Sequence, residues 1–260
     1  MKKTNLFLMI FTVFVFIFLY APMVIMVIFS FNEAKSLGVF TAFSLKWYEK
    51  IFTNTEVWVA LYNSVWVGAV VTAVSIVLGM MMALAVTRFS FVGKPILDAL
   101  ILIPIIIPEI TEALSLLVMY VFLNIPLGPL TVIIGHAAFD VAFVTVVLRA
   151  RMAGYDRTVE EAARTLGANE LQTFFRITLP VMYPAILAAG LLAFTLSFDD
   201  LIKTLFTTGP GFKTLPLIVW SSAARGGVSP DLNALSTFAI SISLLFAVFR
   251  IRAEKKMRGV

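Results

Sequence analysis

The sequence predicts an all-α, polytopic membrane protein with six transmembrane helices, and three observations support that prediction. Hydrophobic residues make up 60% of the 260 residues and charged residues only 13%, which is more apolar surface than a soluble core of this length can bury. The apolar residues form long runs with few charges, and Lys and Arg gather between alternate runs. With no Cys and a single His, the chain lacks the residues for disulfides or for a Cys- or His-rich metal site, and we expect no metal.

Six apolar runs are long enough to cross a bilayer, which takes about 20 helical residues. They cover about 6–30, 60–86, 96–122, 129–150, 181–206 and 232–250. The first run follows Lys2 and Lys3, as in a signal peptide, but it is longer than the roughly 7–15 apolar residues of such a peptide and no A-x-A cleavage site follows. We therefore expect a retained helix and one transmembrane domain over residues 1–260.

Two segments should depart from simple spanning helices. Pro104 and Pro108 lie inside the third run, where they should break or kink the helix and expose backbone that is tolerated only along a cavity or a protein contact. The connection 207–231 is rich in Gly and Pro but contains the apolar segment LPLIVW. We expect it to fold back as a re-entrant or interfacial element.

The distribution of Lys and Arg predicts the orientation. Most of the 20 basic residues lie at the N-terminus, in the second and fourth connections and in the C-terminal tail. By the positive-inside rule, both termini and the long connection after residue 149 are cytoplasmic. The net charge of +5 is thereby explained by topology, so we expect membrane lipid and no nucleic acid as a partner.

The fourth connection should form two short helices. Thr158 and Glu161 have the spacing of a capping box, which predicts a helix from about residue 159. Gly167 can adopt the left-handed conformation that ends this helix, and Asn169 can cap the next one. Such a helical hairpin, with mixed apolar and charged faces, needs a groove on a soluble partner; an amphipathic loop lying on the membrane surface is the alternative.

The same connection carries a recognisable motif. Its residues have the full spacing of the EAA signature of ABC-importer permease subunits: Glu161, Ala162, Ala163, Gly167, Ile177, Leu179 and Pro180. The resemblance implies the ABC type I importer permease (MetI-like) fold and a coupling role for residues 156–180, here called the EAA loop. It also implies the partners: a cytoplasmic ATPase dimer that binds ATP and Mg, a second PotB-like permease and an extracytoplasmic binding protein.

The resemblance extends along the chain. The segments FSLKWYEKIF, SFDDLIKTLFTTGPGF and VSPDLNALST resemble the PotC-type permeases of spermidine/putrescine importers of the bacterial cytoplasmic membrane. This resemblance implies a substrate path for polyamines and a coupling role for Glu170. The transport residues that it implies are Trp47, Glu109, Ser197, Asp199 and Asp200. Branches that import iron(III) or thiamine share much of this pattern and remain alternatives.

The acidic residues inside the spans support a cationic substrate. A carboxylate in mid-membrane costs about 2.5–3.5 kcal/mol on insertion scales, so it should face a water-filled path or a partner. The acids are Glu109, Glu112, Asp140, Asp199 and Asp200, against a single Lys203. Polyamine ammonium groups would bind these carboxylates, and the methylene spacers would pack on aromatic walls such as Phe198 and Trp47.

More ordinary roles remain open for several of these residues. Lys203 can form a local ion pair with Asp199 or with Asp200, but not with both fully. His136 and Asp140 are four residues apart and can pair between helices. Trp47 can be an interfacial anchor, and Glu112 can lie in a solvated mouth.

Several motifs are missing from the sequence. It contains no G-x-x-x-x-G-K-[ST], so we expect no ATP site and no cofactor in this chain. G-x-S-x-G and H-E-x-x-H are absent too, which argues against an enzyme. A stand-alone cation channel or carrier, in which the acids relay ions, is the rival function from another class.

Overall fold

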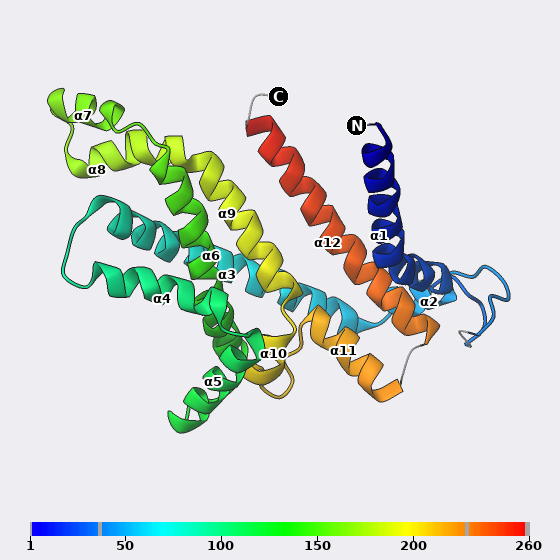
Figure 1. Ribbon diagram of the computed structural model, residues 1–260. Helices are drawn as coiled ribbons and strands as arrows, with labels where there is room; N and C mark the ends of the chain where they lie inside the picture. The colour runs from blue at the N-terminus through cyan, green and yellow to red at the C-terminus, as the bar shows by residue number, and fades with distance from the viewer. Residues whose placement is uncertain (1, 36–37, 227–228, 258–260) are drawn as a thin grey trace. The chain divides into compact units, whose positions relative to one another are not determined.

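The computed structural model describes residues 2–35, 38–226 and 229–257, and these are almost entirely helical (Figure 1). An isolated β-bridge pairs Asn32 with Phe43. The helices are α1 (Lys2–Phe29), α2 (Lys46–Phe52), α3 (Thr55–Arg88), α4 (Lys94–Ile106), α5 (Glu109–Phe122), α6 (Pro129–Ala153), α7 (Thr158–Thr165), α8 (Glu170–Thr173), the π-helix η1 (Phe174–Thr178), α9 (Leu179–Asp199), α10 (Ile202–Thr207), α11 (Leu215–Gly226) and α12 (Pro230–Met257).

The chain divides into two compact units. One comprises residues 1–59 and 218–242, and the other comprises residues 60–217 and 243–260. In the described residues, five helical segments are long and apolar enough to cross a membrane, and the count rises to six when α4 and α5 are taken as one broken span. The predicted all-helical membrane protein is confirmed.

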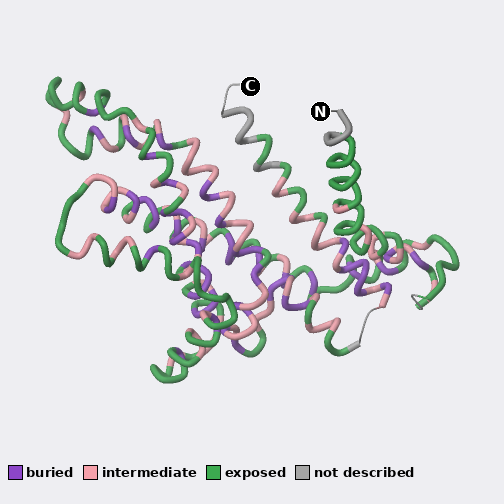
Figure 2. Tube along the Cα trace, viewed as in Figure 1, coloured by how far each residue is buried: buried purple, intermediate pink, exposed green. Residues whose placement is uncertain are grey.

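The first unit contains α1, whose apolar side chains are exposed along most of its length (Figure 2). The membrane-length part of this helix, residues 6–29, has a mean hydropathy of 2.6 in its most apolar window, and none of that window is buried within the chain. A helix that is apolar all round and uncovered by its own chain is stable only in hydrocarbon or against another protein.

The second unit is built around α6, which packs along α4 and α9. Its buried core draws apolar side chains from α3, α6 and α9, several of them small: Met80, Ala83, Val144, Leu148, Met182, Ala189 and Ala193. Membrane helices approach closely where small residues lie at the contact. The short helix α10 packs against α5 and α6, which brings the break after α9 next to the break before α5.

Gly79 is one position where this packing requires a small residue. A Cβ built on it would lie 2.6 Å from Cγ1 of Val144 and 3.2 Å from the backbone nitrogen of Thr145. We expect Gly79→Ala to lower the free energy of unfolding by about 1–3 kcal/mol through overpacking. Thermal unfolding in detergent checks this, with Gly154→Ala as the control because its nearest neighbour, Arg151 O, is 3.9 Å away. Equal melting temperatures of Gly79→Ala and Gly154→Ala would contradict the close approach of α3 to α6 at Gly79.

The proline-rich third span is broken, as the sequence predicts. The chain bends by 108° between α4 and α5. Ile107 and Pro108, which join the two helices, are extended, with ψ of 136° and 132°. Pro108 has no N–H to donate to the preceding turn, so the α4 helix cannot continue through it.

The fifth span differs from the predicted continuous helix over 181–206. Helix α9 starts at Leu179 and ends at Asp199, Asp200 is extended with ψ of 114°, and α10 follows as a separate helix. The cause is local: the Asp200 carboxylate accepts the backbone N–H groups of Lys203 and Thr204 at 2.9 and 3.3 Å. An Asp side chain that binds these N–H groups starts a new helix instead of continuing the old one. The segment 207–231, predicted to fold back, contains α11, and residues 227–228 of it lie outside the described residues.

Candidate functional site

The most unusual feature inside the second unit is a fully buried lysine. Lys203 is 0% exposed. Its ammonium nitrogen Nζ donates to Oε1 of Glu109 at 2.7 Å and to Oδ2 of Asp200 at 2.9 Å, and it lies 4.0 Å from the centre of the Phe139 ring. Two carboxylates and an aromatic face thus enclose one ammonium group. We call Glu109, Asp200 and Phe139 the Lys203 cage.

The cage is assembled from helix ends. Glu109 is the first residue of α5, directly after the break from α4, and Asp200 is the residue at which α9 stops. Lys203 lies in α10, the six-residue helix that begins after that break. Of the two local pairings open to Lys203, the structure forms the one with Asp200. The pairing with Glu109, 94 residues away in the chain, has no signal in the sequence.

His136 extends the polar network but not to its predicted partner. Its Nδ1 shares a hydrogen bond of 2.8 Å with Ser197 Oγ, its Nε2 shares one of 3.0 Å with Thr204 Oγ1, and Nε2 lies 3.6 Å from Asp200 Oδ1. The predicted pair of His136 with Asp140 is therefore wrong, because the imidazole reaches α9 and α10 instead of following its own helix.

Two further acids of this region keep an unsatisfied oxygen. Oδ2 of Asp140 and Oε2 of Glu112 are buried and have no hydrogen-bond partner within the described ranges 2–35, 38–226 and 229–257. Asp140 is 1% exposed, so it does not open onto solvent in this chain. Unsatisfied buried carboxylate oxygens are costly and mark places where a proton, water or cation is accommodated.

Asp199 has the opposite environment to its neighbour Asp200. It is exposed in this chain, and its Oδ1 accepts a hydrogen bond of 2.7 Å from Ser243 Oγ in α12. Among the residues that the structure describes, no Lys or Arg forms an ion pair with it. Of the two adjacent aspartates, Asp200 is neutralised internally, and Asp199 presents an uncompensated carboxylate.

Two predicted aromatic walls are covered by the chain itself. Phe198 is 2% exposed and packs between the rings of Phe194 and Phe246, at centroid distances of 5.8 and 5.4 Å. Trp47, in the first unit, is 7% exposed and donates its Nε1–H to the carbonyl of Asn32 at 2.7 Å. Phe198 is therefore not an open wall in this chain, because neighbouring rings cover it. Trp47 is not a membrane-facing anchor, because it is buried and its N–H is bound to a backbone carbonyl.

The EAA loop folds as the predicted pair of short helices. Gly167 has φ of +92° after α7, and Asn169 and Gln172 form a reciprocal capping box at the start of α8. The first helix starts at Thr158, within one residue of the predicted position. The predicted capping box of Thr158 with Glu161 was wrong: Thr158 lies inside the helix, and its N–H is accepted by Asp156 Oδ1 at 3.0 Å.

The tip of the EAA loop is uncovered. Glu161, Ala162 and Gly167 are exposed, as are the large apolar side chains of Leu166, Leu171 and Phe175. Glu170 is exposed too, and its Oε2 accepts from Arg164 at 3.1 Å. At the other end of the motif, Leu179 is partly buried against the core of the second unit, and Pro180 lies beside it in the first turn of α9.

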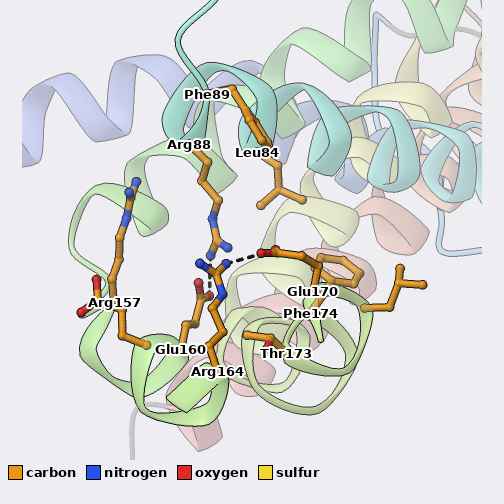
Figure 3. Close-up of a pocket in the computed structure, with 11 residues that line it drawn as sticks. Leu84, Arg88, Phe89, Arg157, Glu160, Arg164, Glu170, Thr173 and Phe174 are labelled. Carbon is orange, nitrogen blue, oxygen red and sulfur yellow. Dashed lines mark hydrogen bonds and ion pairs between the residues drawn. The ribbon is translucent and has the colours of Figure 1, made fainter. Parts of the chain in front are cut away.

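A buried carboxylate ties the EAA loop to two membrane helices. Glu160 is 3% exposed, and its Oε1 accepts from Arg88 at the end of α3 at 2.5 Å (Figure 3). The same oxygen accepts from Thr178, the last residue of η1 directly before α9, also at 2.5 Å. Arg157 of the loop donates to the carbonyl of Thr87 at 3.0 Å. We call Arg88, Glu160 and Thr178 the loop brace. Arg88 and Glu160 line a cavity of about 550 Å³ together with Arg164 and Glu170.

The charge state of the brace follows from its contacts. Burial of the Glu160 carboxyl raises its pKa, but hydrogen bonds from Arg88 and Thr178 and the charge of Arg88 outweigh burial, so that the pKa lies below its ordinary value. Glu160 is ionised at neutral pH. The sequence alone did not single out Arg88 or Glu160, because Glu160 stands beside Glu161 on a short polar helix and nothing local shows which of the two is buried.

Comparison with known proteins identifies the family. Residues 75–254 match the model of the family described as "Binding-protein-dependent transport system inner membrane component". The chain is 38% identical over 252 residues to "Putrescine transport system permease protein PotI" of Escherichia coli strain K12, covering 93% of this chain and 89% of that one. It is 33% identical over 246 residues to "Spermidine/putrescine transport system permease protein PotC" of the same strain, covering 94% and 93%.

Solved structures agree on the fold. A bacterial ABC transporter involved in the import of the acidic polysaccharide alginate contains a chain that matches with a TM-score of 0.77 at 14% identity, covering 98% of this chain and 96% of that one. A chain of the MetNI methionine ABC transporter matches with a TM-score of 0.60 at 18% identity, covering 78% and 99%. The predicted MetI-like fold is confirmed. This chain belongs to the family of binding-protein-dependent transport system inner membrane components and is a multi-pass permease subunit of an ABC importer, a transport component and not an enzyme.

Proposed function

We propose that this chain forms, with a second PotB-like permease, the path by which polyamines such as putrescine and spermidine enter the cytoplasm. The observation that carries the proposal is the uncompensated carboxylate of Asp199, in a chain whose relatives are named for putrescine and spermidine transport. An ammonium group of the substrate would supply the positive charge that no Lys or Arg among the described residues provides for Asp199.

The position of Asp199 along α9 supports this role. Twenty residues separate it from Leu179 at the start of the helix, which corresponds to about 30 Å of helix, the thickness of the hydrocarbon layer. Asp199 would therefore lie near the face of the membrane opposite the EAA loop. With the EAA loop in the cytoplasm, as the distribution of Lys and Arg predicts, Asp199 would meet substrate on the side from which the binding protein delivers it.

The EAA loop would be the contact with the ATPase dimer, which binds ATP and Mg. Its exposed apolar residues, Leu166, Leu171 and Phe175, would be buried in a cleft of that partner. The motif residues at the tip, among them Glu161, Ala162, Ala163 and Gly167, would line the contact together with Glu170. Leu179 and Pro180, at the junction with α9, would pass the motion on to the membrane helices. Both termini would be cytoplasmic.

Asp199→Asn tests the substrate site. It removes one charge-assisted hydrogen bond, worth about 1.5–3 kcal/mol, so we expect kcat/KM for labelled spermidine uptake to fall by about 10- to 100-fold, mainly through KM. The folded protein should be unaffected, because Ser243 can still donate to the Asn oxygen. Asp98→Asn, which neutralises an acid paired with Arg149 at the surface of α4, is the matched control and should retain uptake.

Unchanged spermidine uptake by Asp199→Asn would contradict the proposal. Competition with excess iron(III) or thiamine separates the alternative solutes: neither should reduce spermidine uptake. Transport by the purified chain alone in vesicles without ATP would favour the channel or carrier instead.

A further inference from the structure

The side chain enclosed in the Lys203 cage is itself a primary alkylammonium. It carries one –NH₃⁺ at the end of a methylene chain, the same group that ends a polyamine. The cage provides two carboxylate acceptors at 2.7 and 2.9 Å and a ring face at 4.0 Å, which together form a site selective for an ammonium with N–H donors.

We propose that Lys203 is a tethered occupant of an alkylammonium-binding site, and that an ammonium group of the substrate takes its place during transport. This inference rests on the proposed function for the identity of the substrate, but the chemistry of the cage stands independently of it. Lys203 would hold the site closed and neutralised between transport cycles.

Exchange of one ammonium for another avoids the cost that normally fixes a buried ion pair. Removing one partner of such a pair leaves a buried charge unpaired, which is strongly unfavourable. When a second ammonium enters as Lys203 leaves, Glu109 and Asp200 stay paired throughout. The unsatisfied oxygens of Asp140 and Glu112, both of which interact electrostatically with Lys203, are acceptors that Lys203 does not use and that a substrate with several ammonium groups can.

The members of the cage differ in accessibility, which defines the direction of entry. The Glu109 side chain is 45% exposed, whereas those of Asp200 and Lys203 are 6% and 0% exposed. An arriving ammonium would therefore meet Glu109 first and then compete with Lys203 for it.

The backbone around the cage is suited to such an exchange. Glu109 follows the 108° break between α4 and α5, and Asp200 and Lys203 flank the break before α10. Broken helices near substrate sites let short segments move without displacing whole spans. Lys203 lies in a helix of six residues, so its withdrawal needs the movement of α10 only.

The experiment compares the full-length chain in detergent with and without Lys203→Ala, which shortens the side chain and empties the cage. The probe is n-propylammonium chloride, which matches the removed atoms, Cγ to Nζ. Tetramethylammonium has the charge without N–H donors, and n-propanol has the chain without the charge. We expect the melting temperature of Lys203→Ala to be several degrees below that of the wild type, and to be restored by n-propylammonium alone. The wild type should respond little, since Lys203 already fills the site.

Two further measurements make each outcome decisive. In Lys203→Ala with Glu109→Gln the stabilisation by n-propylammonium should be lost. Its persistence would overturn the proposal, as would equal stabilisation by tetramethylammonium. If Lys203→Ala is unfolded when extracted in plain buffer, extraction in n-propylammonium should recover the folded chain, and failure to do so would contradict the cage.

The exchange step is tested by uptake. Because the substrate no longer competes with Lys203, KM for spermidine in folded Lys203→Ala should fall, by roughly tenfold if Lys203 occupies the cage nine-tenths of the time. An unchanged or higher KM would show that Lys203 is a fixed structural counter-ion. A third outcome separates the two proposals. If the amine restores the melting temperature but neither the wild type nor any variant takes up polyamine, the proposed substrate is refuted and the alkylammonium site is supported.

Discussion

Arg88→Ala is expected to uncouple ATP hydrolysis from transport. The substitution leaves Glu160, which is 3% exposed, without its cation, and removal of one partner of a buried ion pair typically costs about 3–5 kcal/mol. The EAA loop would then lose its buried ion pair to α3 and keep the exposed hydrogen bond from Arg157 to the Thr87 carbonyl, so that movement of the loop is passed to that helix poorly. In proteoliposomes with the assembled transporter, substrate uptake should be almost abolished while ATP hydrolysis continues.

Two further variants separate the brace from a general loss of charge. Arg149→Ala breaks another ion pair, with Asp98, but both side chains are substantially exposed, at 43% and 29%. Such a pair contributes about 0–1 kcal/mol, and uptake should remain close to that of the wild type. Arg88→Glu combined with Glu160→Arg restores opposite charges and should recover part of the uptake. If ATP hydrolysis still drives normal substrate uptake in Arg88→Ala, the loop brace does not transmit movement of the EAA loop to α3.

Asp200→Ala is expected to destabilise the chain severely, whereas Asp199→Asn is not. Asp200 is the acceptor for the Lys203 ammonium and for the N–H groups that start α10. Its loss breaks a buried ion pair, at about 3–5 kcal/mol, and removes a helix cap, at about 1 kcal/mol. Little folded protein should be recovered from the membrane, as measured by size-exclusion chromatography in detergent.

The control for Asp200→Ala removes both charges together. Asp200→Ala with Lys203→Met leaves no unpaired ammonium, and replacing a buried ion pair by apolar groups is often neutral. The double variant should therefore recover most of the folded protein, although it lacks the cap. Normal yield of Asp200→Ala alone would mean that Glu109 is a sufficient partner for Lys203 and that the cap is dispensable.

The sequence by itself determined the features that depend on local composition and spacing. Apolar runs of membrane length predicted the spans, Pro104 and Pro108 predicted the broken third helix, and Gly167 and Asn169 predicted where the short helices of the EAA loop end and begin. Each of these follows from residues within a few positions of one another, since hydrophobic runs, caps and helix breakers act locally. The motif spacing of the EAA loop identified the family on the same local basis.

Only the tertiary structure decided which acid is neutralised and which is available. In a continuous helix Asp199 and Asp200 are equally suited to pair with Lys203, at spacings of four and three residues. The helix breaks at Asp200, and Lys203 pairs with Asp200 and not with Asp199. Lys203 and its second partner, Glu109 of α5, are 94 residues apart in the chain. The brace residues Arg88 and Glu160 are 72 residues apart. Such contacts are fixed by how helices pack and end against one another, and the spacing of residues along the chain carries no record of it.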